Sequence, residues 1–136
     1  MTKTERITTL AGRILLALIF LASGFGKIGD WSQTAGYMAS KGMPLVPFFL
    51  VGAILLEVGG GLSVLLGFRA RIGAAALIVF LIPATLIFHN FWALQGMERQ
   101  VNMIMFLKNL AIMGGLLLVS AFGAGRPSLD NRGKEA

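Results

Sequence analysis

The chain has 136 residues, a hydrophobic fraction of 56% and a mean hydropathy of +0.79, which is the composition of an integral membrane protein. It contains no cysteine and one histidine, which excludes dithiol chemistry, iron–sulfur clusters, a disulfide framework and a bis-histidine haem within one chain. The net charge of +6 is spread over loops, termini and helices, so the cations do not form the single basic face expected of a nucleic-acid-binding protein.

Four apolar runs dominate the sequence, and each is long enough to cross a hydrocarbon core of about 30 Å as a helix. We therefore predict an all-α, polytopic membrane protein: an antiparallel four-transmembrane-helix bundle that forms a single domain over residues 1–125. The first run is too long for a cleaved signal peptide, so we interpret it as a retained helix. The predicted spans are 7–27, 45–66, 71–92 and 101–123.

The connections between these runs differ in character. After the first span, residues 31–41 read as a short amphipathic piece on the membrane surface, where Trp31 and Tyr37 suit an interfacial belt. The connection at residues 68–71 is so short that the second and third spans must form an antiparallel hairpin. Pro83 should kink the third span. The polar tail, residues 126–136, is expected to be cytoplasmic and frayed.

The distribution of cations predicts the orientation. Seven cations fall on the side of the termini and three on the other side, which favours both termini in the cytoplasm. The first group is Lys3, Arg6, Arg69, Arg71, Arg126, Arg132 and Lys134, and the second is Lys41, Arg99 and, at the edge, Lys27.

Ionisable residues inside the spans are costly in hydrocarbon and often mark a functional site. In the predicted orientation Glu57 lies near the midplane, on a face of small residues that should point into the bundle. Lys108 is the expected counter-ion of Glu57, with Lys27 as the second choice. The outer third of the bilayer gathers Lys27, His89, Asn90, Lys108 and Asn109, whereas Arg13 stands alone in the inner leaflet.

Each of these residues also has a purely structural interpretation, which the sequence leaves open. Arg13 and Lys27 are near span ends, where long side chains can extend to the headgroups. His89 can be an interfacial residue bonded to a carbonyl group. Glu57 and Lys108 can form a clasp that only fixes helix order. The glycine clusters at residues 59–61 and 114–115 are typical of tight helix packing.

Several segments resemble the DoxX family of small bacterial inner-membrane proteins. They are Arg13–Ala17 with Gly24–Ile28, Glu57–Gly61 with Leu65–Arg71, His89–Trp92, and Phe106–Gly115, in that order along nearly the whole chain. The resemblance implies a four-helix inner-membrane bundle. Some members of the family are membrane subunits of thiosulfate:quinone oxidoreductases, and others associate with redox and detoxification enzymes. The resemblance supplies no agreed catalytic residues.

A polar pocket that opens toward lipid is therefore the first functional hypothesis. It makes the protein a membrane subunit linked to redox or stress metabolism that binds quinone or another lipid-like ligand, with no covalently bound cofactor and no metal. Whether the chain is itself an enzyme stays open. The ligand-binding candidates are Lys27, Glu57, His89, Asn90, Trp92, Lys108 and Asn109.

Two other functions compete with this hypothesis. A non-enzymatic scaffold or assembly partner would use its buried charges only to order the helices, and its glycine-rich faces would contact a second copy or a larger membrane complex. A solute or proton pathway ranks last, because four short helices leave little room for a pore. The expected partners are membrane lipid and other membrane proteins, and nucleic acid is not among them.

Overall fold

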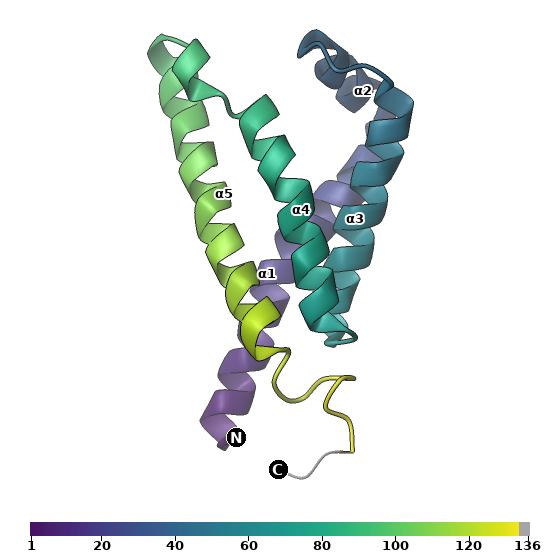
Figure 1. The fold of residues 1–136 in the computed structure, drawn as a ribbon, viewed down its shortest axis with the longest axis vertical. Helices are drawn as coiled ribbons and strands as arrows, with labels where there is room; N and C mark the ends of the chain where they lie inside the picture. Colours follow the sequence, from purple (N-terminus) through teal and green to yellow (C-terminus); the bar gives the residue numbers. More distant parts are fainter. Residues whose placement is uncertain (134–136) are drawn as a thin grey trace.

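The structure, a computed structural model, describes residues 1–133 and is entirely helical (Figure 1). Four long helices run antiparallel, and the N-terminus and the last described residues lie at one end of the bundle, which we call the terminal end. A short helix, α2, covers part of the opposite end, which we call the α2 end. The elements are α1 (Lys3–Gly29), α2 (Trp31–Ser40), α3 (Val46–Leu66), α4 (Ala70–Phe88), the short 3-10 helix η1 (Phe91–Ala93) and α5 (Gly96–Phe122).

Local sequence explains where the helices begin and end. At the start of α1, the Thr2 side chain accepts a hydrogen bond from the amide of Glu5, whose carboxylate accepts one from the amide of Thr2, and together they form a capping box. A proline occupies the first turn of α3, where no helical amide is lost. Gly67 ends α3 in the left-handed region, with φ of 67°, and so permits the tight turn into α4.

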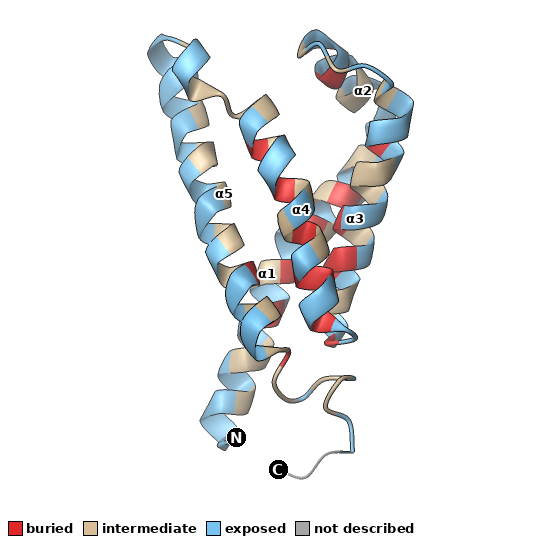
Figure 2. Ribbon diagram, viewed as in Figure 1, coloured by how far each residue is buried: buried red, intermediate tan, exposed pale blue. Residues whose placement is uncertain are grey.

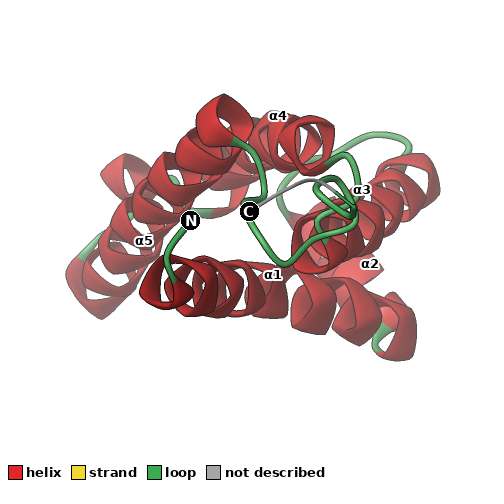
Figure 3. Cartoon of the chain, turned by 90° about the horizontal axis from the view of Figure 1, so that it is seen from below, coloured by secondary structure: helices red, strands yellow, loops and turns green. Residues whose placement is uncertain are grey.

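The helices form an open ring (Figure 3). Viewed from the terminal end, α1 and α4 lie on opposite sides, with α3 and α5 between them. Contacts are extensive from α1 to α3, α3 to α4 and α4 to α5, whereas α1 and α5 touch only sparsely. The bundle is therefore least closed along the α1–α5 side.

The buried core lies mainly on α1, α3 and α4, and α5 contributes a single buried residue, Leu116 (Figure 2). Toward the α2 end, α4 and α5 diverge from α2 and α3 (Figure 1). The core cluster is Ala17, Phe20, Val64, Ala74, Leu77, Leu81 and Leu116.

Glycines allow the closest helix approaches, but not every glycine of the predicted clusters does so. A Cβ on Gly60 would lie 2.6 Å from the Leu77 side chain of α4, and one on Gly61 would lie 3.0 Å from Leu21 of α1. A Cβ on Gly59 or Gly114 would meet nothing within 4 Å. Tight packing therefore explains Gly60 and Gly61, and it does not explain Gly59 or Gly114.

The C-terminal segment, residues 123–133, is bonded to the bundle, so the expectation of a frayed tail is wrong for these residues. The amides of Leu129 and Asp130 donate to the carbonyls of Leu66 and Gly67, at 3.1 and 2.7 Å. The Asp130 carboxylate accepts from the amides of Arg69 and Ala70, at 2.6 and 2.9 Å. The physical reason is that the α3–α4 turn leaves free backbone groups that this carboxylate satisfies. Lys134 and the rest of the predicted tail lie outside the described residues.

Arg13 is held inside the bundle, so extension of its side chain to the headgroups is ruled out. The side chain is 3% exposed, and its Nη1 donates to the carbonyl of Leu65 at 3.2 Å. Its Nη2 donates to the carbonyl of Pro127. Arg13 thus joins α1 to the end of α3 and to the C-terminal segment.

Candidate functional site

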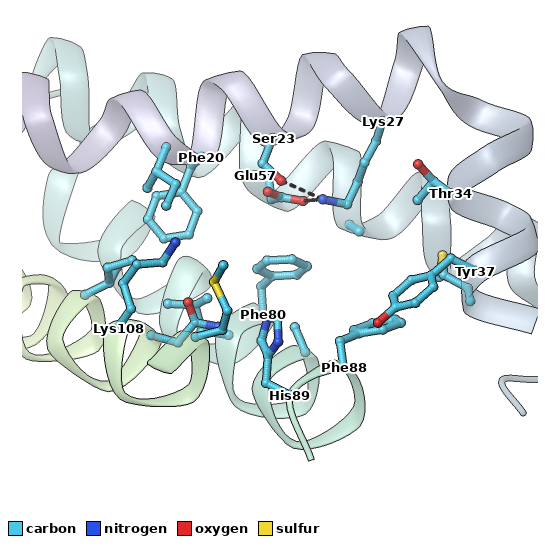
Figure 4. Close-up of a pocket in the computed structure, with 18 residues that line it drawn as sticks. Phe20, Ser23, Lys27, Thr34, Tyr37, Glu57, Phe80, Phe88, His89 and Lys108 are labelled. Carbon is cyan, nitrogen blue, oxygen red and sulfur yellow. Dashed lines mark hydrogen bonds and ion pairs between the residues drawn. The ribbon is translucent and has the colours of Figure 1, made fainter. Parts of the chain in front are cut away.

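An ion pair between α1 and α3 forms one wall of the candidate site (Figure 4). The ammonium of Lys27 lies 2.6 Å from Oε1 of Glu57, and it also donates to the hydroxyl of Ser23 at 2.6 Å. The Glu57 side chain is only 2% exposed, whereas that of Lys27 is 22% exposed. A carboxylate this deep is tolerable in apolar surroundings because an opposite charge contacts it.

This pairing corrects two expectations. The expected counter-ion, Lys108, is not the partner of Glu57, because α1 packs directly against α3 and brings Lys27 closer. The close approach depends on Gly24, where a Cβ would lie 2.6 Å from the side chain of Val58 and 3.3 Å from that of Glu57. Extension of Lys27 to the headgroups is also wrong, since its nitrogen turns inward.

The ion pair faces a pocket of about 370 Å³, which we call the intramembrane pocket. Every long helix and α2 contribute to its walls. The lining is mostly apolar, with a small number of polar groups from different helices. The polar and ionisable lining residues are Ser23, Lys27, Thr34, Tyr37, Glu57, His89, Lys108 and Asn109.

Five of the seven sequence-predicted candidates line this pocket, namely Lys27, Glu57, His89, Lys108 and Asn109. The structure does not bring the other two, Asn90 and Trp92, into its lining. Trp92 is 53% exposed and makes edge contacts with the rings of Phe91 and Phe106. Both residues follow the end of α4 at Phe88, where the chain leaves the helix.

Two of the pocket's polar groups also join α4 to α5. Nδ1 of His89 lies 3.0 Å from the side-chain oxygen of Asn102, and the Asn109 amide donates to the hydroxyl of Thr85 at 3.0 Å. His89 thus bonds to a side-chain amide oxygen, while the rest of its ring borders the pocket. Such bonds fix how the two helices pack.

Sequence reasoning missed the contribution of α2 to the pocket. Thr34, Tyr37 and Met38 line the pocket, and Met38 is buried. The ring of Tyr37 stacks on that of Phe88 at a centroid distance of 5.5 Å, which joins α2 to the end of α4. The signal was the spacing of Thr34, Tyr37 and Met38, which places them on one face of a short helix. Read alone, that face is also what a membrane-surface helix would show.

Within residues 1–133 no group of three or more histidine, cysteine or acidic side chains is placed to hold a metal ion. The pocket offers hydrogen-bond donors, the carboxylate of Glu57 and aromatic rings. Two ammonium groups, an imidazole and a phenol border it, and the aromatic rings of Phe20, Phe80 and Phe88 lie among them (Figure 4).

Comparison with known proteins places the chain in a family. The DoxX family model matches residues 8–90, which covers most of α1 and all of α2, α3 and α4. The chain belongs to the DoxX family. It is 40% identical over 130 residues to the Escherichia coli inner membrane protein YqjF, with 96% of this chain and 95% of that protein covered. The inner membrane protein YphA of the same organism is 36% identical over 126 residues, covering 93% of this chain and 90% of YphA.

These two relatives and the four apolar helices identify the chain as a multi-pass inner-membrane protein. A more distant similarity extends to a longer eukaryotic protein. The yeast ER-derived vesicles protein ERV29 is 27% identical over 132 residues, which cover 97% of this chain and 36% of ERV29. No solved structure matches the chain.

Proposed function

We propose that this DoxX-family protein is a membrane subunit that binds a lipid-like ligand in the intramembrane pocket and serves redox or stress metabolism. The observation that carries the proposal is the pocket itself, which places ionisable groups from separate helices around one apolar chamber. Binding sites for small molecules typically combine apolar walls with a few convergent polar groups.

Quinone is the redox-active candidate for the ligand. Its carbonyl oxygens can accept hydrogen bonds from the lysine or histidine side chains, and its ring can stack on Phe80 or on the Tyr37–Phe88 pair. With no cysteine and a single histidine, the chain offers few ligands for an electron carrier of its own. In this proposal a partner protein therefore supplies the electron carrier, and this chain holds the lipid-soluble reactant.

The test fills the pocket with a larger side chain. Ala84 lines the pocket on α4, whereas the nearby Leu86 is 51% exposed and does not line it. The full chain is placed in lipid nanodiscs, and binding of a short-chain ubiquinone is measured by native mass spectrometry. We expect Ala84→Phe to abolish quinone binding and Leu86→Phe to leave it unchanged. Equal binding by the unmodified protein and both variants would contradict the proposal.

A scaffold function is the second candidate, and specific contacts favour it. The polar residues inside the bundle join neighbouring helices: Lys27 with Glu57, His89 with Asn102, and Asn109 with Thr85. A scaffold needs those contacts and has no need of the pocket. Ala84→Phe should therefore preserve the cellular function of a scaffold and abolish that of a ligand-binding subunit, provided that the variant reaches the membrane in normal amounts.

The orientation is part of the proposal. Four antiparallel helices bring both termini to the same side, and the arginines of the α3–α4 turn and of the C-terminal segment lie at that end. Cytoplasmic loops of membrane proteins carry an excess of lysine and arginine. We therefore place the terminal end in the cytoplasm and the α2 end on the far side of the inner membrane.

A further inference from the structure

Lys108 is a charged residue within a membrane-spanning helix that has no counter-ion in the described part of the chain. Among residues 1–133 the structure contains one salt bridge, and it joins Lys27 to Glu57. Asp130 is bonded to the amides at the start of α4. The other described acidic residues are at or near helix ends: Glu5, Asp30 and Glu98.

The position of Lys108 along α5 makes this charge costly. α5 runs from Gly96 to Phe122, so Lys108 lies near the middle of this helix and within the predicted span. The twelve residues back to Gly96 and the fourteen on to Phe122 correspond to about 18 Å and 21 Å of helix. The side chain extends across the intramembrane pocket toward Phe20 of α1 (Figure 4). Lys108 is among the exposed residues, so its ammonium group is open to the pocket and to the surrounding lipid, where an anionic partner would stabilise it.

A second cavity begins where Lys108 lies. It has a volume of about 670 Å³ and follows the sparse contact between α1 and α5, so we call it the α1–α5 groove. Lys108 and Ile112 line both this groove and the intramembrane pocket, so the two cavities lie on either side of these residues. Toward the terminal end the groove is mainly apolar, and its charged lining residue there, Arg13, is 3% exposed and bonded to the carbonyls of Leu65 and Pro127. The apolar lining includes Leu15, Leu16, Leu118, Val119 and Phe122.

Charge balance indicates the kind of ligand that completes this arrangement. The pocket holds two ammonium groups and one carboxylate. Glu57 balances the charge of Lys27, so the charge of Lys108 is the excess positive charge. A neutral ligand leaves that excess positive charge in apolar surroundings, and an anionic head removes it. The groove that leads away from Lys108 has mainly apolar walls, which are suited to a hydrocarbon chain.

We infer that the intramembrane pocket and the α1–α5 groove together hold one single-chain amphiphile with an anionic head. The head pairs with the ammonium of Lys108, and the chain lies in the groove between α1 and α5. This inference rests on the proposed function, and within the class of lipid-like ligands it selects an acid over a neutral quinone. The head is a carboxylate or a phosphate monoester, since either supplies the required negative charge.

The experiment compares head groups on the same chain. The full-length protein is placed in nanodiscs of phosphatidylcholine, and native mass spectrometry measures binding of oleate, oleoyl lysophosphatidate, methyl oleate and a short-chain ubiquinone. We expect at least one of the two anions to bind about tenfold more tightly than methyl oleate. Preference for oleate alone assigns a carboxylic acid, and preference for lysophosphatidate assigns a phosphate head.

Variants at Lys108 test the pairing. Lys108→Met should remove the preference for the anion while methyl oleate binds as before, and Lys108→Arg should retain the preference. Lys3→Gln removes an exposed positive charge at the terminal end and should change nothing. If Lys108→Met does not fold, Lys108→Arg still tests the pairing, with Lys3→Gln as the control. Loss of the preference for the anion in Lys108→Arg would overturn the pairing of the head with a cation at this position.

A variant in the groove tests the path of the chain. A Cβ on Gly12 would meet nothing within 4 Å, and Gly12 lines the groove, so Gly12→Leu adds side-chain volume there with no clash at its Cβ. It should weaken binding of oleate about tenfold and leave binding of the short octanoate unchanged. Equal loss of both acids would overturn the assignment of the chain to the groove.

The failures of the two proposals are distinguishable. Binding of ubiquinone and methyl oleate with no preference for either anion would overturn the inference and leave the proposed function standing. That result is also expected if Lys108 is uncharged or pairs with an intramembrane carboxylate of a partner protein. Absence of binding by all four probes would overturn the proposed function itself.

Discussion

The ion pair between Lys27 and Glu57 predicts an unequal response to loss of either partner. Lys27→Met leaves a carboxylate that is 2% exposed without its counter-ion, and breaking a buried pair in this way costs about 3–5 kcal/mol of folding free energy. Glu57→Gln leaves an ammonium that is 22% exposed, bonded to Ser23 and close to the end of α1. That ammonium can move toward the headgroups, so we expect a cost of only about 1 kcal/mol.

The double variant separates the ion pair from the shape of its side chains. Replacing both residues by neutral ones of similar size removes the unpaired charge, and we expect a total cost below that of Lys27→Met alone. The free energies come from reversible unfolding by sodium dodecyl sulfate in mixed micelles, followed by tryptophan fluorescence, with Lys3→Met as the matched lysine control. Equal costs for the two single variants, or a double variant whose cost is their sum, would refute this reasoning.

Three further predictions concern packing and orientation. Asp130→Ala should lower the unfolding free energy by about 1–2 kcal/mol in the same assay, because the first amides of α4 lose their acceptor; an unchanged value would show that the C-terminal segment does not cap α4. Gly60→Ala should cost about 1–3 kcal/mol, since its Cβ would lie 2.6 Å from a leucine of α4, whereas Gly59→Ala should cost nothing measurable. Because the chain has no cysteine, Lys41→Cys should be labelled in intact cells by a membrane-impermeant maleimide and Asn131→Cys only after lysis; the reverse pattern would invert the proposed orientation.

The fold was largely predictable because few arrangements satisfy four apolar helices in a bilayer. Backbone polar groups must be bonded within each span, and the short turn at residues 67–69 forces α3 and α4 into a hairpin. The helix bounds were harder to predict. Polar residues such as Glu98 and Gln100 interrupt the apolar run without interrupting the helix, so α5 begins at Gly96 and not at 101. Hydropathy indicates which residues can lie in the bilayer core, whereas backbone hydrogen bonding determines where a helix ends.

Most of the polar residues that line the candidate site could be predicted from the sequence, but the contacts between them could not. Helical spacing placed Glu57 on the small-residue face that packs inward, and the structure buries it there. The sequence could not decide which lysine pairs with Glu57, because that choice depends on the order of the helices around the ring. α1 lies against α3, whereas α5 is separated from α3 by α4. The same order leaves Lys108 without a carboxylate and opens the groove beside it.

Arg13 and Asp130 show why the terminal end was misjudged. In the sequence Arg13 is a charged residue of the first span with no expected partner, and Asp130 is one residue of a polar tail. In the structure they act on the same turn: Arg13 binds the carbonyl of Leu65, and Asp130 binds the amides at the start of α4. Their partners are backbone groups, which no side-chain pattern reveals. Polar residues near a short membrane turn are therefore best judged by the backbone groups that the turn leaves unbonded, and not by hydropathy alone.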